Sequence, residues 1–201
     1  MRVVLASANP GKLRELQALL AGSGIEIVAQ TDLGIEPVAE TGLTFLENAL
    51  LKARHAAARC GLAAIADDSG LEVDALDGRP GVRSARYAGP EASDADNIAR
   101  LLADLALVAP EKRTARFRCV LVLVRSASDP APLICEGVWE GCIKDSPTGA
   151  NGFGYDPLFL VGDLGLTAAQ LSPDLKNRLS HRGQALRRLV AAIGAQGGTI
   201  S

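Results

Sequence analysis

An apolar run that leads directly into two adjacent carboxylates constrains this chain more than any other feature. Leu62–Ile65 is followed by Ala66-Asp67-Asp68-Ser69-Gly70. Short apolar runs are typical of buried strands, and open α/β sheets bind ligands beyond the carboxyl ends of such strands. Buried carboxylates need a positive partner, such as a metal ion. The pattern therefore indicates either a cation site after a strand or a turn whose Asp and Ser side chains bond to their own backbone.

Size and composition predict one globular domain over residues 1–201, folded as two lobes around a cleft. Of the 201 residues, 48% are hydrophobic and 22% are charged, and the net charge is −2. Such a chain has no overall basic field that favours nucleic acid. No apolar run approaches the roughly 20 residues that cross a bilayer, and Met1–Ala6 is too short for a signal peptide. We therefore expect a cytoplasmic protein that binds neither nucleic acid nor membrane.

The four cysteines lack the spacing of a metal or redox motif. They are Cys60, Cys119, Cys135 and Cys142, with no Cys-x-x-Cys pair among them. Isolated cysteines of this kind behave as small buried hydrophobic residues and are expected to stay reduced.

Turn signals and apolar spacing predict an α/β fold with a mixed sheet. The predicted strands are Arg2–Ala6, Ile25–Ala29 and a hairpin of Ala115–Arg125 and Pro132–Ile143 that turns at Ser126–Pro130. Helices are predicted after Asn9-Pro10-Gly11, from Thr44 to about Arg59, over Glu91–Leu107, from Ser172-Pro173 and after Ser180. Thr44 and Glu47 have the capping-box spacing, and Leu46, Leu50, Ala53 and Ala57 are expected to face inward from that helix.

Two predicted helices begin with cations, where the partial charge of the helix dipole is unfavourable for them. Lys12 lies in the first turn of one helix, and His181 and Arg182 lie in the first turn of another. An exposed cation tolerates this position, whereas an anionic ligand turns it into an advantage. Free backbone N–H groups together with a cation form a phosphate site. The segment Ser7–Lys12 is not a Walker A loop, because the Gly-Lys-Ser/Thr ending is absent.

Two further side chains have both a binding and a structural interpretation. Lys52 shares a helix face with Asn48, and it is either solvated or a second phosphate contact. Glu40 either joins the acidic pair as a metal ligand or is an ordinary loop glutamate.

A glycine-rich loop over Gly149–Pro157 places aromatic residues where a packed core is hard to build. Phe153 either stacks on a planar base or packs into the core. Asp156 precedes a proline and is therefore held extended, so it either accepts hydrogen bonds from a base edge or caps the turn.

Five segments, in this order along the chain, resemble the inosine triphosphate pyrophosphatase family. They are Ser7-Ala8-Asn9-Pro10-Gly11-Lys12, Glu40-Thr41-Gly42-Leu43-Thr44-Phe45, Asp67-Asp68-Ser69-Gly70, Gly152-Phe153-Gly154-Tyr155-Asp156-Pro157 and Ser180-His181-Arg182-Gly183. Each is weak alone, but together they span nearly the whole chain. The resemblance implies an elongated mixed α/β fold with a central cleft between two lobes, and a homodimer.

The resemblance also implies the reaction. Members hydrolyse ITP, dITP and XTP between the α and β phosphates, with magnesium, to the monophosphate and pyrophosphate. They thereby clear the nucleotide pool of bases that would enter DNA or RNA. Carried over to this chain, Asp68 is the catalytic acid/base, and Glu40 and Asp68 bind Mg²⁺. The implied substrate-binding residues are Ser7, Ala8, Asn9, Pro10, Gly11, Lys12, Lys52, Ser69, Phe153, Gly154, Tyr155, Asp156, Lys176, His181 and Arg182.

Two questions stay open at the level of sequence. A carboxylate bound directly to Mg²⁺ is a poor base, so either Asp68 contacts the metal through water or Asp67 takes one of the two roles. Selectivity against adenine is expected from His181 and Arg182, which can donate to the C6 oxygen of hypoxanthine or xanthine and would leave adenine's amino group unpaired. Guanine also carries this oxygen, so what excludes GTP stays open.

Two other functions compete with this one. A Maf-like pyrophosphatase acting on pyrimidine or modified nucleotides is disfavoured by the order of the motifs. A nucleotide sensor without catalysis is disfavoured by the acidic pair, because carboxylates repel phosphate unless a metal intervenes.

Overall fold

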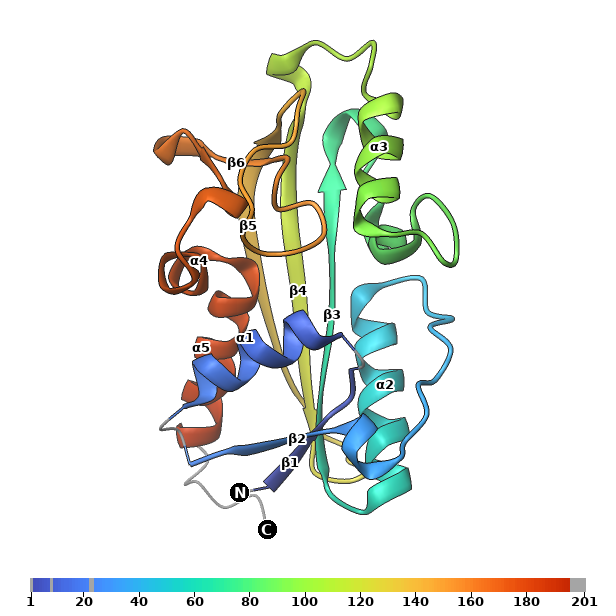
Figure 1. Ribbon diagram of the computed structural model, residues 1–201. Coiled ribbons are helices and arrows are strands. Elements are labelled where there is room, and N and C mark those ends of the chain that lie inside the picture. The colour runs from blue at the N-terminus through green and yellow to red at the C-terminus, as the bar shows by residue number, and fades with distance from the viewer. Residues whose placement is uncertain (1, 8, 22–23, 196–201) are drawn as a thin grey trace. The chain divides into compact units, whose positions relative to one another are not determined.

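The computed structural model describes residues 2–7, 9–21 and 24–195, and it has a mixed α/β fold, as predicted (Figure 1). One sheet has the strand order β2-β1-β3-β4-β5-β6-β7. β1 runs parallel to β2 and β3, whereas β6 is antiparallel to β5 and β7. The strands are β1 Arg2–Leu5, β2 Glu26–Ala29, β3 Ala63–Val73, β4 Thr114–Val124, β5 Leu133–Ile143, β6 Phe159–Val161 and β7 Leu166–Thr167. The α-helices are α1 Pro10–Leu20, α2 Phe45–Cys60, α3 Asp94–Asp104, α4 Pro173–Leu179 and α5 His181–Ala195. Among the described residues, no helix combines the length and the apolar character that a membrane crossing requires.

The chain divides into two compact units. Unit 1 comprises Met1–Asp68, Cys119–Gly137 and Arg182–Ser201, and unit 2 comprises Ser69–Arg118 and Val138–His181. Both units have a hydrophobic core of their own.

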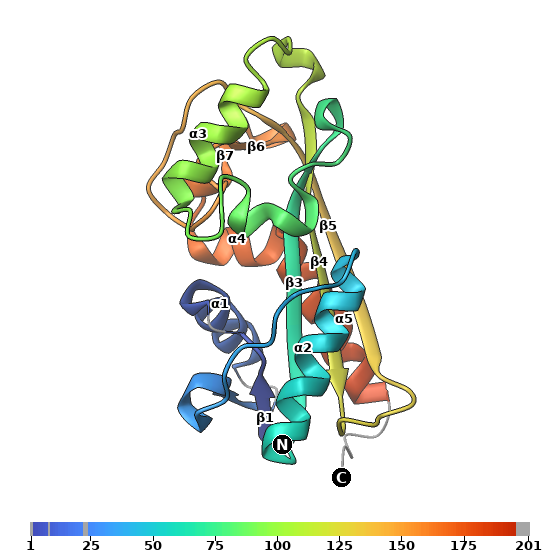
Figure 2. The same ribbon diagram turned by 90° about the vertical axis from the view of Figure 1, so that its right-hand side faces the viewer.

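In unit 1, helices cover both faces of the strands. Every residue of β4 from Cys119 to Val124 is buried, as expected for a strand packed on two sides. α1 and α5 lie on one side and α2 on the other (Figure 1, Figure 2). Leu16 and Leu20 of α1 pack in one cluster with Leu186 and Leu189 of α5.

The buried face of α2 is formed mostly by alanines and not by the two leucines that the sequence predicts to face inward. Ala53 and Ala57 are buried as predicted, but Leu46 and Leu50 are only half-buried. The other buried positions of this helix are Phe45, Asn48, Ala49 and Ala56. Small side chains let the backbone of a helix approach a sheet closely, so the alanine stripe replaces the expected leucines against β1.

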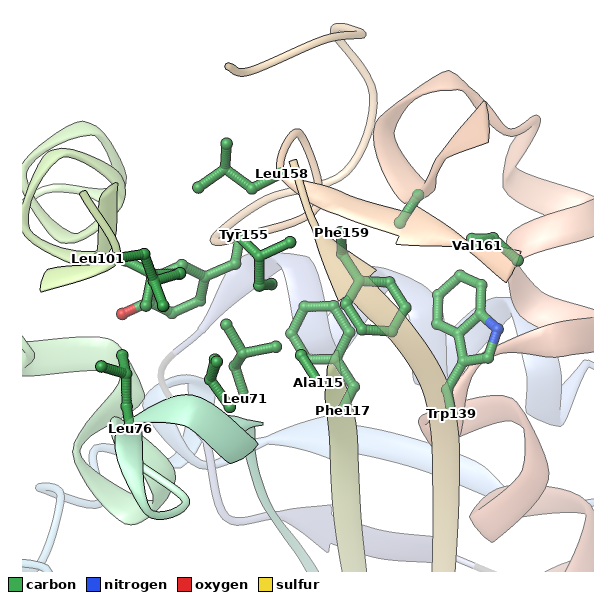
Figure 3. Close-up of a cluster of buried hydrophobic side chains, with 14 of the residues drawn as sticks. Leu71, Leu76, Leu101, Ala115, Phe117, Trp139, Tyr155, Leu158, Phe159 and Val161 are labelled. Carbon is green, nitrogen blue, oxygen red and sulfur yellow. The ribbon is translucent and has the colours of Figure 1, made fainter. Parts of the chain in front are cut away.

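In unit 2, the same strands alternate between buried and polar side chains. Along β4, Ala115 and Phe117 are buried, whereas Arg116 and Arg118 form ion pairs with acidic residues on the opposite face. The inward side chains form an aromatic core (Figure 3). The Phe159 ring centroid lies 4.5 Å from that of Phe117 and 5.2 Å from that of Trp139. Trp139, to which the sequence assigns no role, is therefore a core residue of unit 2.

One expectation about the acidic pair is wrong. The sequence predicts a strand that ends before Asp67, but β3 continues through Asp67 and Asp68 as far as Val73. Charged residues can occupy the middle of a buried strand when each carboxylate has a positive partner, and both of these have one. The alternative interpretation, an Asp/Ser/Gly turn, is therefore wrong.

Substitution of Gly141 of β5 by alanine adds a Cβ atom and tests how tightly the aromatic core of unit 2 is packed. This Cβ would lie 2.7 Å from Cζ of Phe159 and would also meet the carbonyl oxygen of Leu160. We expect Gly141→Ala to lower the free energy of unfolding by about 1–3 kcal/mol through overpacking, as measured by urea denaturation.

Gly162 supplies the matched control. A Cβ there meets no atom within 4 Å, so Gly162→Ala should change the free energy of unfolding by about 0.5 kcal/mol or less. Equal effects of the two substitutions would contradict the packing argument.

Candidate active site

The pleat of β3 sends the two adjacent carboxylates to opposite faces of the strand. Successive side chains of a strand alternate between its faces. Asp67 has the same orientation as Ile65, which packs in the cluster of α1 and α5, and it accepts a hydrogen bond from Sγ of Cys119 in that cluster. Asp68 instead pairs with Lys52 of α2. Neighbours in sequence therefore have entirely different surroundings.

Asp67 is the centre of a buried ionic network. Its side chain is 0% exposed, and its Oδ1 lies 2.5 Å from Nζ of Lys12. Its Oδ2 accepts from Nε of Arg182 at 2.8 Å and from Sγ of Cys119 at 3.2 Å. Burial alone raises the pKa of Asp67, but the charges of Arg182 and Lys12 outweigh it and hold that pKa well below its ordinary value. Asp67 is thus an ionised anchor with donors on both oxygens.

Arg182 has two carboxylate partners that the sequence does not predict. Its Nε donates to Asp67 and its Nη1 donates to Glu15 of α1, while its predicted contact with a purine stays a prediction. Burial alone lowers the pKa of Arg182, and the charges of Asp67 and Glu15 outweigh it and raise that pKa. Two of its three guanidinium nitrogens therefore donate to carboxylates of unit 1.

Asp68 forms a second network with Lys52 and Glu40. Nζ of Lys52 lies 2.6 Å from Oδ1 of Asp68 and 2.8 Å from Oε1 of Glu40, and it also donates to the carbonyl oxygen of Asp67 at 2.9 Å. Burial raises the pKa of Asp68 above its ordinary value, although Lys52 and Lys12 act in the opposite direction. Burial alone lowers the pKa of Lys52, but Asp68 and Glu40 outweigh it, so this ammonium stays charged. Oδ2 of Asp68 is buried and has no hydrogen-bond partner among the described residues.

The first turn of α2 holds the loop that carries Glu40. Thr44 and Glu47 form the predicted capping box, and the Glu47 carboxylate also accepts from the Leu43 amide at 2.7 Å. Oδ1 of Asn48 accepts from the Gly42 amide at 2.8 Å, and Asn48 is 0% exposed. Since Asn48 lies one helical turn before Lys52, α2 fixes both Lys52 and the loop that brings Glu40 to it.

The Glu40 and Asp68 carboxylates have the chemistry of a Mg²⁺ site. Among the described residues, no three His, Cys, Asp or Glu side chains converge as a complete set of metal ligands. Mg²⁺, however, is usually bound through one or two carboxylates, with the remaining ligands supplied by water and by phosphate oxygens. The unpartnered Oδ2 of Asp68 and the charge of Glu40 fit that pattern.

The start of α1 is capped by its own residue Asn9. Oδ1 of Asn9 accepts from the amides of Gly11 and Lys12 at 2.8 and 3.1 Å, and the Asn9 amide donates to Ser7 Oγ at 3.2 Å. Pro10 occupies the first turn. The amides predicted to be free for an anion are therefore occupied by Asn9, and the Lys12 side chain reaches Asp67. Ala8 lies outside the described residues.

In unit 2, the glycine-rich loop is held by Asp156 and Lys176. Oδ2 of Asp156 accepts from the Phe153 amide at 2.9 Å and from Nζ of Lys176 at 2.7 Å, and both charged side chains are buried. The same Nζ lies 4.9 Å from the centroid of the Phe153 ring, within the range of a cation–π contact. Asp156 therefore caps the turn, and Phe153 is half-buried above Lys176.

Other contacts fix the rest of this loop. The Gly154 amide donates to Asp94 at the start of α3 at 2.7 Å, and the Tyr155 hydroxyl donates to the Ser84 carbonyl oxygen at 2.8 Å. Burial raises the pKa of Tyr155, so its hydroxyl stays protonated as a donor. His181 stacks on Phe117, with ring centroids 4.8 Å apart, and Ser69 is half-buried on β3.

The predicted site residues thus fall into two groups, one in each unit. The group of unit 1 is Ser7, Asn9, Pro10, Gly11, Lys12, Glu40, Lys52, Asp67, Asp68 and Arg182, and the group of unit 2 is Ser69, Phe153, Gly154, Tyr155, Asp156, Lys176 and His181. Sequence reasoning missed Glu15, Cys119 and Asp94 as partners of these residues. Only Glu15 carries a usable signal, because it lies one turn after Lys12 on the same helix.

Asp67→Asn tests whether the network of unit 1 stabilises the fold. Loss of the charge leaves the half-buried Lys12 and the buried Arg182 without their common counter-ion, and we expect the free energy of unfolding to fall by about 3–5 kcal/mol at neutral pH. Because the folded-state pKa of Asp67 is depressed, its contribution is fully present above the ordinary aspartate pKa and is lost as pH falls through the folded-state pKa. The stability gap to the unsubstituted protein should stay constant down to about pH 4 and shrink below it.

Asp163→Asn, at an exposed position of unit 2, is the control for this substitution. Urea denaturation across the pH range compares the three proteins. If Asp67→Asn lowers the free energy of unfolding no more than Asp163→Asn does, the anchoring role of Asp67 is refuted.

The chain is similar to known proteins over nearly its whole length. The model of the Ham1 family matches residues 3–192, a range that includes all five motifs described above. A protein of Methylococcus capsulatus called dITP/XTP pyrophosphatase is 62% identical over 194 residues, which cover 96% of each chain. One of the same name from Pectobacterium atrosepticum is 59% identical over 192 residues, covering 96% of this chain and 98% of that one.

A solved structure of a HAM1 protein from Coxiella burnetii superimposes with a TM-score of 0.90 at 50% identity. It covers 97% of this chain and 99% of its own. The membership that the five motifs predict is confirmed by these matches. The chain belongs to the Ham1 family.

Proposed function

We propose that this protein hydrolyses purine nucleoside triphosphates that carry hypoxanthine or xanthine, namely ITP, dITP and XTP. The products are the nucleoside monophosphate and pyrophosphate, so that these bases are cleared from the cytoplasmic nucleotide pool. The names of relatives at 55–62% identity support this substrate class. The observation that carries the proposal is the Asp68–Lys52–Glu40 network, in which the buried Oδ2 of Asp68 has no hydrogen-bond partner in the part of the chain that the structure describes.

The group of unit 1 is suited to the phosphates. We assign the segment Ser7–Lys12, together with Lys52, to binding the triphosphate, and the backbone amides of Gly11 and Lys12 would donate to an anion that replaces the Asn9 cap. The amides of Gly11 and Lys12 already hold an acceptor oxygen, Oδ1 of Asn9, so a phosphate oxygen can take its position. Arg182 belongs to this group because it pairs with Asp67. We assign it the role of orienting the Asp67 carboxylate, which in turn orients the Lys12 side chain.

Glu40 and Asp68 would hold Mg²⁺, which when bound neutralises phosphate charge and positions the attacking water. Asp68 is the general base in this proposal, which requires that it contacts the metal through water and not directly, and its Oδ2 accepts the proton of the attacking water. Asp67 is unsuited to this role, because donors occupy both of its oxygens and its pKa is depressed.

The group of unit 2 is suited to the nucleoside. Phe153 offers a ring face for stacking, and Lys176 and Asp156 offer a donor and an acceptor held in fixed positions. Ser69, Gly154 and Tyr155 complete this group. Because Arg182 donates to Asp67 and Glu15, His181 is the stronger candidate for the donor that meets the C6 oxygen and disfavours adenine. A homodimer, implied by the family resemblance, is part of the proposal and is checked by light scattering against the chain mass of 20.8 kDa.

Pyrophosphate release from ITP, XTP, ATP and GTP tests the reaction. With Mg²⁺ we expect release from ITP and XTP, none from ATP, and none from any nucleotide in EDTA. Asp68→Asn keeps the shape of the side chain but removes the base, and we expect kcat to fall about 10²–10⁴-fold.

Three outcomes would count against this proposal. Release at equal rates from all four nucleotides would remove the base selectivity. An Asp68→Asn variant with unchanged kcat would remove the catalytic assignment. Tight binding of ITP without any release would identify a nucleotide sensor instead.

A further inference from the structure

We propose that the Lys52 ammonium occupies the position of the divalent cation between Glu40 and Asp68, so that the two compete for these carboxylates until a nucleotide binds. This inference rests on the proposed function, because it concerns the cation and phosphate sites assigned there. Lys52 is then a built-in counter-ion of the free protein as well as a phosphate contact.

All the donor capacity of Lys52 is used within the protein. An ammonium group has three N–H donors. Nζ of Lys52 has three acceptors at hydrogen-bond distance, namely Glu40 Oε1 at 2.8 Å, Asp68 Oδ1 at 2.6 Å and the carbonyl oxygen of Asp67 at 2.9 Å. In this arrangement no N–H remains for a phosphate oxygen. Lys52 can bind phosphate only after it releases at least one of these acceptors.

The carboxylates of Glu40 and Asp68, in turn, need another positive partner when Lys52 moves away from them. Glu40 and Asp68 both direct an oxygen at the same nitrogen, so a single point lies within reach of both. Asp68 is 6% exposed, and a buried carboxylate without a counter-ion is strongly unfavourable. A divalent cation is the replacement that the chemistry of two carboxylates selects. Departure of Lys52 and binding of the cation are therefore one exchange.

The exchange makes metal and nucleotide binding cooperative. Without nucleotide, Lys52 competes with the cation and lowers its affinity. With nucleotide, the phosphate accepts the N–H groups of Lys52, and the competition is removed. By linkage, the nucleotide raises metal affinity by the same factor by which the metal raises nucleotide affinity.

Lys12 provides the matched control, because it carries the same charge nearby and shares with Lys52 only the carbonyl oxygen of Asp67. It donates to Oδ1 and to the carbonyl oxygen of Asp67, and to neither Glu40 nor Asp68. Lys12→Met removes one positive charge from this region without emptying the position between the two carboxylates. Lys52→Met removes the charge and empties the position.

The test is calorimetric titration of Mn²⁺, without nucleotide, into the unsubstituted protein, Lys52→Met and Lys12→Met, each checked for folding by circular dichroism. We expect Lys52→Met to bind Mn²⁺ about tenfold more tightly than the unsubstituted protein, and Lys12→Met to change the affinity by about threefold or less. Adding an ITP analogue with a non-hydrolysable α–β bridge should raise Mn²⁺ affinity in the unsubstituted protein far more than in Lys52→Met. Lys52→Gln provides a second neutral variant if the methionine variant does not fold.

The inference is overturned if Lys52→Met binds Mn²⁺ no more tightly than Lys12→Met, or binds none. Pyrophosphate release by the unsubstituted protein, measured in the same preparations, separates the two proposals. Release with Mg²⁺ together with unchanged Mn²⁺ affinity in Lys52→Met would leave the proposed function standing and remove only the competition.

Discussion

The alternation of side chains along β3 is the constraint on which the rest of unit 1 depends. It separates two carboxylates that are covalent neighbours and gives each its own cations, Lys12 and Arg182 for Asp67 and Lys52 for Asp68. Were both side chains on one face, mutual repulsion would force one of them to stay protonated. Instead, one pKa is depressed and the other raised. A structural anchor and a chemically available carboxylate thus follow one another in the chain.

The elements around β3 are adapted to this separation. α1 supplies Lys12 and Glu15 on the side of Asp67, and α5 supplies Arg182 there. α2 supplies Lys52 on the other side. The small buried residues of α2, such as Ala49 and Ala53, allow this helix to pack closely, and its capped first turn fixes the loop of Glu40. The same helices therefore pack against the sheet and supply the charged partners of its two carboxylates.

Local patterns in the sequence predict much of this arrangement. The hairpin of β4 and β5, the capping box of Thr44 and Glu47 and the helices are recognisable because their signals lie within a few residues. The continuation of β3 through its carboxylates has no such signal. Its stabilising partners come from positions 55 and 115 residues away, Lys12 and Arg182. The dipole argument correctly marks both cations as unusual, but it cannot show that protein carboxylates already meet them.

The carbonyl oxygen of Asp67 connects the two ionic networks. It accepts from Nζ of Lys52 at 2.9 Å and from Nζ of Lys12 at 3.3 Å, so one main-chain atom joins the cations of both faces. Every amino acid supplies this oxygen, and for that reason no alanine scan can remove it. Coupling between the two lysines persists through any substitution at position 67. Only a change to the backbone itself, such as an ester in place of the amide after residue 67, weakens this acceptor. Such a change reveals how much this oxygen contributes to the coupling between the two lysines.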